Sequence, residues 1–380
     1  MRPLLLAFTL MLLASELQAA DGNCAWPDWL AFREAYIDDG RVLDRSGRTP
    51  ITTSEGQAYS LFFALVANDR DSFDRLLMWT NQNLAAGDIG SQLPSWLWGA
   101  KANGQYGIID SNAAADADLW IAYTLSEAGR LWNSHYYASL GYLMARRIAG
   151  EETANIAGLG RLLLPAPSGF ITHKSNPSEN TYRINPSYTP LHILDYLAKI
   201  YPQQPWAEIA STTANLNHMV STSGFVPDWL LVSKTGVATD KQTSGKGSYE
   251  AIRSYLWAGM LADTHPHKQN LITAMAPMLA KTIANGAAPE SVDTRDGRSS
   301  GHGPVGFMAA LLPLMSSSPT YHQQAPKIAA QVALARAEIP RGRGYYDTVL
   351  SLFGVGWIEH RYRFALDGTL LPAWENAQCN

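Results

Sequence analysis

The sequence predicts an all-α protein, an (α/α)6 barrel in which six outer helices surround a ring of six inner ones. Apolar residues recur with a helical period through most of the 380-residue chain, and few runs alternate as a strand would. The helical segments come in pairs whose first members start about 60 residues apart, the length that two helices and their loops need. The first member of each pair is apolar on nearly every face, as a helix buried all round should be.

The twelve expected helices divide into these two sets along the chain. The inner set carries Gly, Ala and aromatic residues on most faces and begins near Ser54, Asp116, Pro186, Ser248, Gly303 and Gly344. The outer set shows polar faces, such as Arg146-Arg147 and Lys281. The helices are expected at about 27–36, after Glu55, after Asp71, and at about 116–130, 134–149, 187–201, 205–221, 248–262, 267–285, 303–315, 321–337 and 345–354.

The first twenty residues have the pattern of a signal peptide. Arg2 gives a positive start, Leu4 to Leu13 an apolar stretch, and Ala19-Ala20 a cleavage site of small residues. The apolar stretch is shorter than the ~20 residues that cross a bilayer. We therefore expect a signal peptide at 1–20, one domain at 21–380 because no linker divides it, and a periplasmic or secreted protein without membrane insertion.

The composition excludes several classes of partner. Charged residues make up 16% of the chain and its net charge is −4, with no basic cluster for nucleic acid or a membrane surface. No Cys or His group has metal-ligand spacing and no Gly-rich phosphate loop is present, so neither a metal nor a cofactor is expected. Several aromatic residues stand in Gly- and Pro-rich loops, where flat rings suit stacking on pyranose sugars. These loop aromatics include Trp96, Trp98, Phe170, Tyr182, Trp229 and Trp357.

The two cysteines, Cys24 and Cys379, lie near opposite ends of the chain that remains after cleavage. An oxidising compartment permits a disulfide between them, which would close a very long loop. Two unpaired thiols are the alternative, and export favours the disulfide.

Three acidic residues, Glu55, Asp116 and Glu250, each stand where an aromatic-rich inner helix is expected to begin. Side chains on the first turn point out of the end of a helix, so three carboxylates there indicate acid–base chemistry in an open groove. The alternative for each is an ordinary helix cap, worth about 0.3–1 kcal/mol through the helix dipole.

The neighbours of these acids favour a chemical role over capping. Ser54 is expected to cap its helix with Gln57 reaching back, which leaves Glu55 on the first turn. Arg253 follows Glu250 by three residues, the spacing of a surface ion pair. Apolar neighbours indicate instead a buried pair, in which the arginine keeps the acid ionised as a general base requires.

Two runs around these carboxylates resemble glycoside hydrolase family 8: Thr53-Ser54-Glu55-Gly56-Gln57, and Ala115-Asp116-Ala117-Asp118 with Ala122, Ala128 and Trp132 beyond. The resemblance extends over the chain after residue 20, including both cysteines. Within the family it is to periplasmic endo-1,4-β-glucanases of bacterial cellulose synthase operons. Further runs that carry it are Trp26-Pro27, Pro94-Ser95-Trp96-Leu97-Trp98-Gly99, Asn185-Pro186-Ser187-Tyr188, Ala251-Ile252-Arg253, Gly303-Pro304-Val305-Gly306-Phe307 and Leu352-Phe353-Gly354.

The resemblance implies an (α/α)6 barrel whose open groove binds a β-1,4-glucan and cleaves it internally with inversion. Glu55 matches the general acid, and Asp116 matches a residue that holds the distorted sugar. Glu250 matches the general base, a position at which the subgroup usually has aspartate, and Arg253 would orient it. Asp116 is the alternative base. Residues that resemble the lining of the cleavage subsite are Tyr188 and Trp120.

The substrate and the partners follow from the same resemblance. A β-1,4-glucan chain is the expected substrate, linked to cellulose biosynthesis, and a loose association with a cellulose synthase complex is left open. The remaining aromatic residues expected to bind this chain are Trp96, Trp98, Tyr182 and Trp357. Two alternatives stay open: a family 8 hydrolase of xylan or chitosan, and a non-catalytic protein that binds or guides a glycan.

Overall fold

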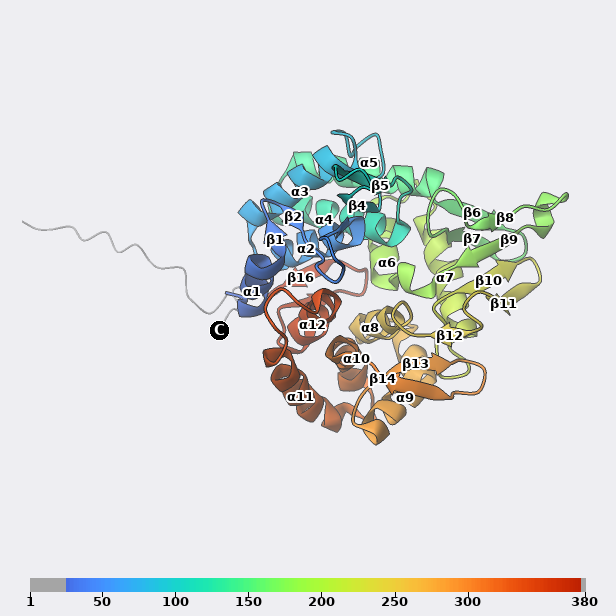
Figure 1. The fold of residues 1–380 in the computed structure, drawn as a ribbon. Coiled ribbons are helices and arrows are strands. Elements are labelled where there is room, and N and C mark those ends of the chain that lie inside the picture. Colours follow the sequence, from blue (N-terminus) through green and yellow to red (C-terminus); the bar gives the residue numbers. More distant parts are fainter. Residues whose placement is uncertain (1–24, 377–380) are drawn as a thin grey trace, which may run out of the picture.

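The computed structural model describes residues 25–376, and its helices form an inner and an outer ring (Figure 1). The inner helices are α2 (Ser54–Val66), α4 (Ala115–Leu131), α6 (Leu191–Ile200), α8 (Ile252–Met260), α10 (Val305–Ser317) and α12 (Tyr345–Ile358). The outer helices are α1 (Pro27–Tyr36), α3 (Arg70–Leu84), α5 (His135–Glu151), α7 (Trp206–Val220), α9 (Lys268–Asn285) and α11 (Ala325–Ala337). The predicted (α/α)6 architecture and its order of inner and outer helices are confirmed.

Short antiparallel strands, which the periodicity did not predict, extend the connections between helices. The larger sheets contain β3 (Thr52–Thr53), β4 (Leu97–Ala100) and β5 (Tyr106–Asp110); β8 (Ile171–Thr172), β9 (Thr181–Ile184), β10 (Leu230–Ser233) and β11 (Gly236–Thr239); and β12 (Lys246–Gly247), β13 (Pro289–Asp293) and β14 (Ser299–His302). The two-stranded pairs are β1 (Ile37–Asp38) with β2 (Arg41–Val42), β6 (Thr153–Ile156) with β7 (Gly160–Leu163), and β15 (Tyr362–Phe364) with β16 (Leu370–Pro372). Most of these strands lead from an outer helix into the next inner helix, so they surround the end of the barrel at which the inner helices begin.

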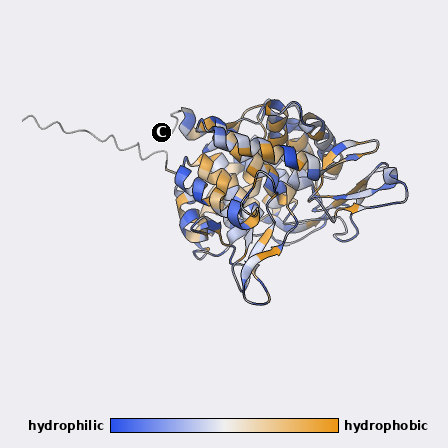
Figure 2. Ribbon diagram, turned by 90° about the horizontal axis from the view of Figure 1, so that it is seen from above, coloured by the Kyte–Doolittle hydropathy of each residue, from blue (hydrophilic) through white to orange (hydrophobic). Residues whose placement is uncertain are grey.

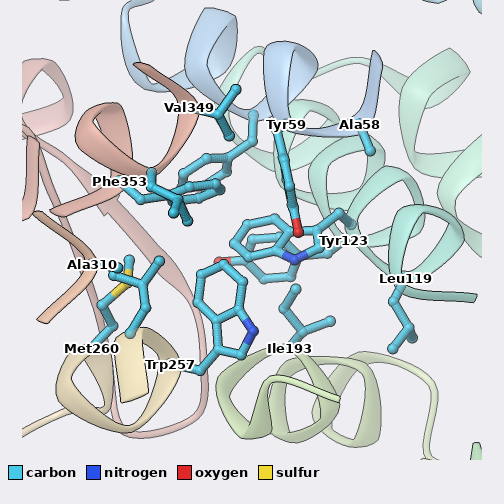
Figure 3. Close-up of a cluster of buried hydrophobic side chains, with 14 of the residues drawn as sticks. Ala58, Tyr59, Leu119, Tyr123, Ile193, Trp257, Met260, Ala310, Val349 and Phe353 are labelled. Carbon is cyan, nitrogen blue, oxygen red and sulfur yellow. The ribbon is translucent and has the colours of Figure 1, made fainter. Parts of the chain in front are cut away.

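The core lies along the barrel axis, where aromatic side chains of the inner helices meet. Tyr59, Trp257 and Phe353 converge there from α2, α8 and α12 (Figure 3). Trp120 of α4 lies among them with no exposed surface, its ring centroid 5.3 Å from those of Trp257 and Phe353. Apolar residues are concentrated along the helices in Figure 2. The prediction that Trp120 lines a substrate subsite is therefore wrong, because the packing of four inner helices encloses it.

Glycine residues allow three inner helices to pack closely. A Cβ atom on Gly354 of α12 would overlap the carbonyl oxygen of Ala309 on α10. A Cβ atom on Gly259 of α8 would overlap the backbone of Leu314 on the same α10. The absence of a side chain at these two positions sets how closely α8 and α12 approach α10.

Two further aromatic residues expected to bind substrate are buried among other side chains. Tyr182 of β9 packs in a small core beneath its sheet, together with Leu216 of α7. Trp357 lies in the last turn of α12, whereas the sequence suggested a loop, and it is 5% exposed. It packs against Tyr362, and the guanidinium group of Arg363 lies 4.2 Å from its ring centroid. Both assignments as substrate-binding residues are corrected, because these side chains serve packing.

The described residues do not include every predicted feature. Residues 1–20, predicted to be the signal peptide, lie outside them, as do Cys24 and Cys379. Between residues 25 and 376, no helix has the length and apolar character that crossing a membrane requires.

Candidate active site

The three carboxylates predicted from the sequence come together at the end of the barrel where the inner helices begin. Glu55 is the second residue of α2 and Asp116 the second of α4. Glu250 lies in a turn two residues before α8, so the expectation that it stands on the helix itself is wrong. The turn brings it to the same place as a first helical turn would.

The cap of α2 also differs from the predicted capping box. The side chain of Thr53, not Ser54, accepts the hydrogen bond from the backbone of Gly56, at 3.1 Å. Gln57 is fully buried and does not reach back to the cap. Its Oε1 atom accepts from the Val42 amide at 2.7 Å, and its Nε2 atom donates to Thr80 at 2.8 Å. Gln57 therefore ties α2 to β2 and α3, because buried groups of these elements need its hydrogen bonds.

Arg253 on the first turn of α8 joins all three carboxylates. Its Nη1 atom lies 2.8 Å from Oε2 of Glu55 and 3.3 Å from Oδ2 of Asp116. Its Nη2 atom forms an ion pair with Oε2 of Glu250. The side chain of Arg253 is 2% exposed, whereas those of Glu55 and Glu250 are 29% and 35% exposed. One buried cation thus faces three acids, two of which reach the surface of the site.

Burial, with the charges of the neighbouring acids, raises the pKa of two of these carboxyl groups. Burial raises the pKa of Glu55, the attraction of Arg253 opposes it in part, and the charge of Glu250 adds to it. Burial together with the nearby Glu55 raises the pKa of Asp116 to about 7. Glu55 therefore retains its proton to a higher pH than a free glutamate does, as a general acid requires.

Asp228 and Asn185, two residues that the sequence analysis did not identify as part of the site, hold Glu250 in place. The carboxylate oxygen Oδ1 of Asp228 accepts from three backbone amides of this turn, those of Ser248 at 2.7 Å, Glu250 at 3.2 Å and Ala251 at 2.9 Å. The Nδ2 atom of Asn185 donates to Oε2 of Glu250 at 3.1 Å. Both contacts join segments far apart in the chain, so no local pattern could have indicated them.

Aromatic side chains flank the carboxylates on two sides. Tyr188 lies beside Arg253, with the guanidinium group 5.5 Å from its ring centroid. Beyond it, the ring of Trp229 stacks on that of Phe170, with centroids 5.7 Å apart and planes 10° apart. Trp96, which is 36% exposed, follows on the other side, where its carbonyl accepts the hydrogen bond of the Ser54 amide.

Trp98 stands further out on the Trp96 side. Its ring contacts those of Trp79 and Tyr106, and the guanidinium group of Arg41 is 4.3 Å from its centroid. Of the predicted substrate-binding aromatics, Tyr188, Trp96 and Trp98 thus lie at this end of the barrel.

The second aspartate of the Asp116–Asp118 run has a separate environment. Asp118 and Glu152, at the end of α5, are both completely buried. Burial raises the pKa of each carboxyl group well above its usual value. The charge of Asp116 raises the pKa of Asp118 further, and the charge of Asp118 raises the pKa of Glu152. Asp118 therefore belongs to a buried acid pair between α4 and α5 and does not point at Arg253.

Comparison with known proteins gives one consistent result. The model of the family described as glycosyl hydrolases family 8 matches residues 2–360. An endoglucanase of Escherichia coli O157:H7 is 42% identical over 367 residues, which cover 96% of this chain and 95% of that protein. An endoglucanase of Xanthomonas axonopodis pv. citri is 41% identical over 379 residues, which cover 98% and 96%.

Solved structures agree with these relatives. The crystal structure of an endo-1,4-D-glucanase from Vibrio fischeri ES114 superposes with a TM-score of 0.87 at 45% identity, covering 92% of this chain and 99% of that one. A cold-adapted family 8 xylanase gives a TM-score of 0.67 at 15% identity, covering 90% of each chain, which shows a shared fold alone.

Proposed function

The chain belongs to glycosyl hydrolases family 8 and is an endo-1,4-β-glucanase, and we propose that Glu55 and Glu250 are the general acid and general base of its reaction. The observation that carries this proposal is the single buried guanidinium group of Arg253, which contacts both carboxylates and Asp116. It holds the acids in one cluster while leaving Glu55 and Glu250 partly exposed to a sugar chain.

The reaction follows as a single displacement at the anomeric carbon. Glu55, whose pKa burial raises, gives its proton to the glycosidic oxygen as the bond to the anomeric carbon breaks. Glu250 takes a proton from a water molecule, whose oxygen attacks that carbon from the opposite face. This arrangement of acid and base inverts the anomeric configuration.

Asp116 suits the role of holding the sugar better than that of the base. Its Oδ1 atom already accepts from the Ala117 amide at 2.9 Å, and its side chain is 3% exposed. Its buried Oδ2 atom lies 3.3 Å from Nη1 of Arg253 but accepts no hydrogen bond from residues 25–376, so a sugar hydroxyl could donate one to it. With a pKa of about 7, Asp116 can also donate a hydrogen bond while protonated.

The substrate class rests on the flanking aromatic residues. Trp96 and Trp98 on one side, and Tyr188 and Trp229 on the other, offer rings to a chain of pyranose units. Within the β-1,4-linked glycans we assign a glucan such as cellulose. Among the residues that the structure describes, no contact in the site specifically favours xylan or the cationic chains of chitosan.

The place of action is part of the same proposal. The predicted signal peptide supports export to the periplasm, where cleavage of glucan chains would accompany cellulose synthesis. N-terminal sequencing of the protein recovered from the periplasm tests the export, and the chain is expected to begin after Ala20.

Three substitutions test the assigned roles on carboxymethyl-cellulose, with reducing ends as the readout. Glu55→Gln is expected to lower the rate at least ~100-fold, because general acid catalysis contributes about 10²–10⁴-fold. Glu250→Gln is expected to do the same. The matched control is Glu179→Gln, an exposed acid paired with Lys234 far from the site, which should act at the normal rate. A Glu55→Gln enzyme that retains most activity refutes the acid assignment. Activity in Glu250→Gln but not in Asp116→Asn moves the base to Asp116.

A further inference from the structure

The chain contains the run Asn-Pro-Ser twice, at 176–178 and at 185–187. In each, the Oδ1 atom of the asparagine accepts from both the amide and the hydroxyl of the serine two residues later. These distances are 3.1 and 2.9 Å at Asn176, and 3.0 and 2.8 Å at Asn185. Each run opens a short 3-10 turn, Pro177–Glu179 and Pro186–Tyr188. The local function of both asparagines is therefore the same, to cap a turn.

The two runs differ in their surroundings. The first lies on the surface, whereas Asn185 and Ser187 are 1% and 2% exposed. Because Oδ1 of Asn185 faces the Ser187 amide, its Nδ2 atom must point the other way, and it donates to Oε2 of Glu250 at 3.1 Å. The hydroxyl of Ser187 in turn accepts from Nη2 of Arg253 at 3.3 Å. A closed ring of hydrogen bonds thus joins the buried turn to both Glu250 and Arg253.

In this ring of hydrogen bonds, the two carboxylate oxygens of Glu250 have different partners. Oε2 receives two donors, Nη2 of Arg253 and Nδ2 of Asn185. Oε1 accepts no hydrogen bond from the residues that the structure describes, and the side chain is 35% exposed. We infer that Asn185 is a positioning residue that fixes the base, holding Oε2 so that Oε1 takes the proton of the attacking water. This inference rests on the proposed role of Glu250 as base.

The contact between Asn185 and Glu250 matters because the side chain of glutamate is longer than that of aspartate. Glutamate has one more rotatable bond than aspartate, so its carboxylate loses more conformational freedom when it is held in one orientation. Asp228 fixes the backbone of the turn, and Asn185 and Arg253 fix the carboxylate at the far end of the side chain. Since a misplacement of about 1 Å can cost ~100-fold in rate, the alignment of Oε1 depends on these contacts.

Asn185→Asp separates the two functions of this side chain. An aspartate has the same shape and still accepts the hydrogen bonds of Ser187, but it places an acceptor where Glu250 needs a donor. We expect kcat to fall about 10- to 100-fold with KM changed less than about twofold. The acid limb of the kcat–pH profile should move to higher pH, because a second carboxylate disfavours the ionised form of Glu250. The titratable or charged groups around Glu250 in the native site are Glu55, Asp116, Asp228, Arg253, Tyr188 and Tyr346.

Asn176→Asp makes the same change in the exposed turn and is the matched control, with kcat and pH profile expected to stay as in the native enzyme. An Asn185→Asp enzyme with native kcat and pH profile overturns the inference, as does one in which KM alone rises. If Asn185→Asp does not fold, Asn185→Ser, which keeps an acceptor for Ser187 but cannot reach Glu250, must show the same fall in kcat. Glu250→Gln is measured in parallel. If Glu250→Gln is inactive while Asn185→Asp has the kcat and pH profile of the native enzyme, only the positioning role of Asn185 is refuted. If Glu250→Gln is active, the proposed role of Glu250 as general base is refuted.

Discussion

Replacing Asp116 by asparagine is expected to stabilise the protein at neutral pH, although it lowers the activity of the enzyme. The carboxyl group of Asp116 has a pKa of 3.8 as a free side chain and about 7 in the folded protein. Between these values the folded state binds the proton and the unfolded state releases it. The free energy of unfolding therefore falls as pH rises through this interval.

The pKa values set the size of the effect. Each pKa unit corresponds to about 1.4 kcal/mol, so ionisable Asp116 lowers the free energy of unfolding by roughly 1 kcal/mol at pH 4.5 and roughly 4 kcal/mol at pH 7.5. Asparagine has no proton to release, so Asp116→Asn avoids this loss. Arg253 is not left without a partner in the variant, because Glu55 and Glu250 still contact it. Relative to the native protein, the free energy of unfolding of the variant should therefore rise by about 3 kcal/mol more at pH 7.5 than at pH 4.5.

Urea unfolding followed by tryptophan fluorescence, at both pH values and with both proteins, measures this difference. A gain of equal size at pH 4.5 and 7.5 would show that the ionisation of Asp116 is not its cause. A variant less stable than the native protein at pH 7.5 would show that Arg253 stabilises the carboxylate more than burial disfavours it.

The remaining predictions concern packing and substrate contact. Gly354→Ala should lower the free energy of unfolding by about 1–3 kcal/mol, because the added methyl group meets the Ala309 carbonyl between α12 and α10. Gly150→Ala on α5, where a Cβ atom meets nothing within 4 Å, should instead raise it by up to ~1 kcal/mol; equal effects of the two changes in urea unfolding would contradict the close approach. Trp357→Ala should cost about 3–5 kcal/mol of stability and leave KM for cello-oligosaccharides unchanged. Trp96→Ala should raise KM several-fold, because it loses a stacking contact of about 0.5–1.5 kcal/mol, and it should cost little stability. If Trp357→Ala instead raised KM and Trp96→Ala instead lowered stability, Trp357 would be a substrate-binding residue after all.

Much of the barrel could be predicted because each helix has its own apolar periodicity. The opening helix at 27–36 and the outer helix at 267–285 agree with the structure within one residue at each end. The start of α8 was placed four residues early, because Ser248 to Ala251 form a turn that Asp228 holds from another segment. The strands were missed because most have two to four residues, too few to show an alternating pattern.

In the candidate site too, residues marked by a local pattern could be predicted, whereas those that depend on contacts between distant segments could not. Glu55 and Asp116 were found because a helix start is a local pattern, and their position follows from the barrel. Trp357 was assigned to the substrate as an aromatic residue of a supposed loop, and Trp120 through the family resemblance. Neither argument reveals which neighbours enclose a tryptophan in the folded protein. Asn185 lies 65 residues from Glu250 in the chain, so its amide contact exists only in the folded protein.

The anomeric form of the first product tests the central claim most directly. Proton NMR of cellopentaose hydrolysis, recorded within the first turnovers, separates the α-anomer from the β-anomer before mutarotation mixes them. With Glu55 as acid and Glu250 as base, the newly formed reducing end should appear as the α-anomer. A β-anomer as the first product would mean a covalent glycosyl-enzyme, and it would contradict the roles proposed for both carboxylates.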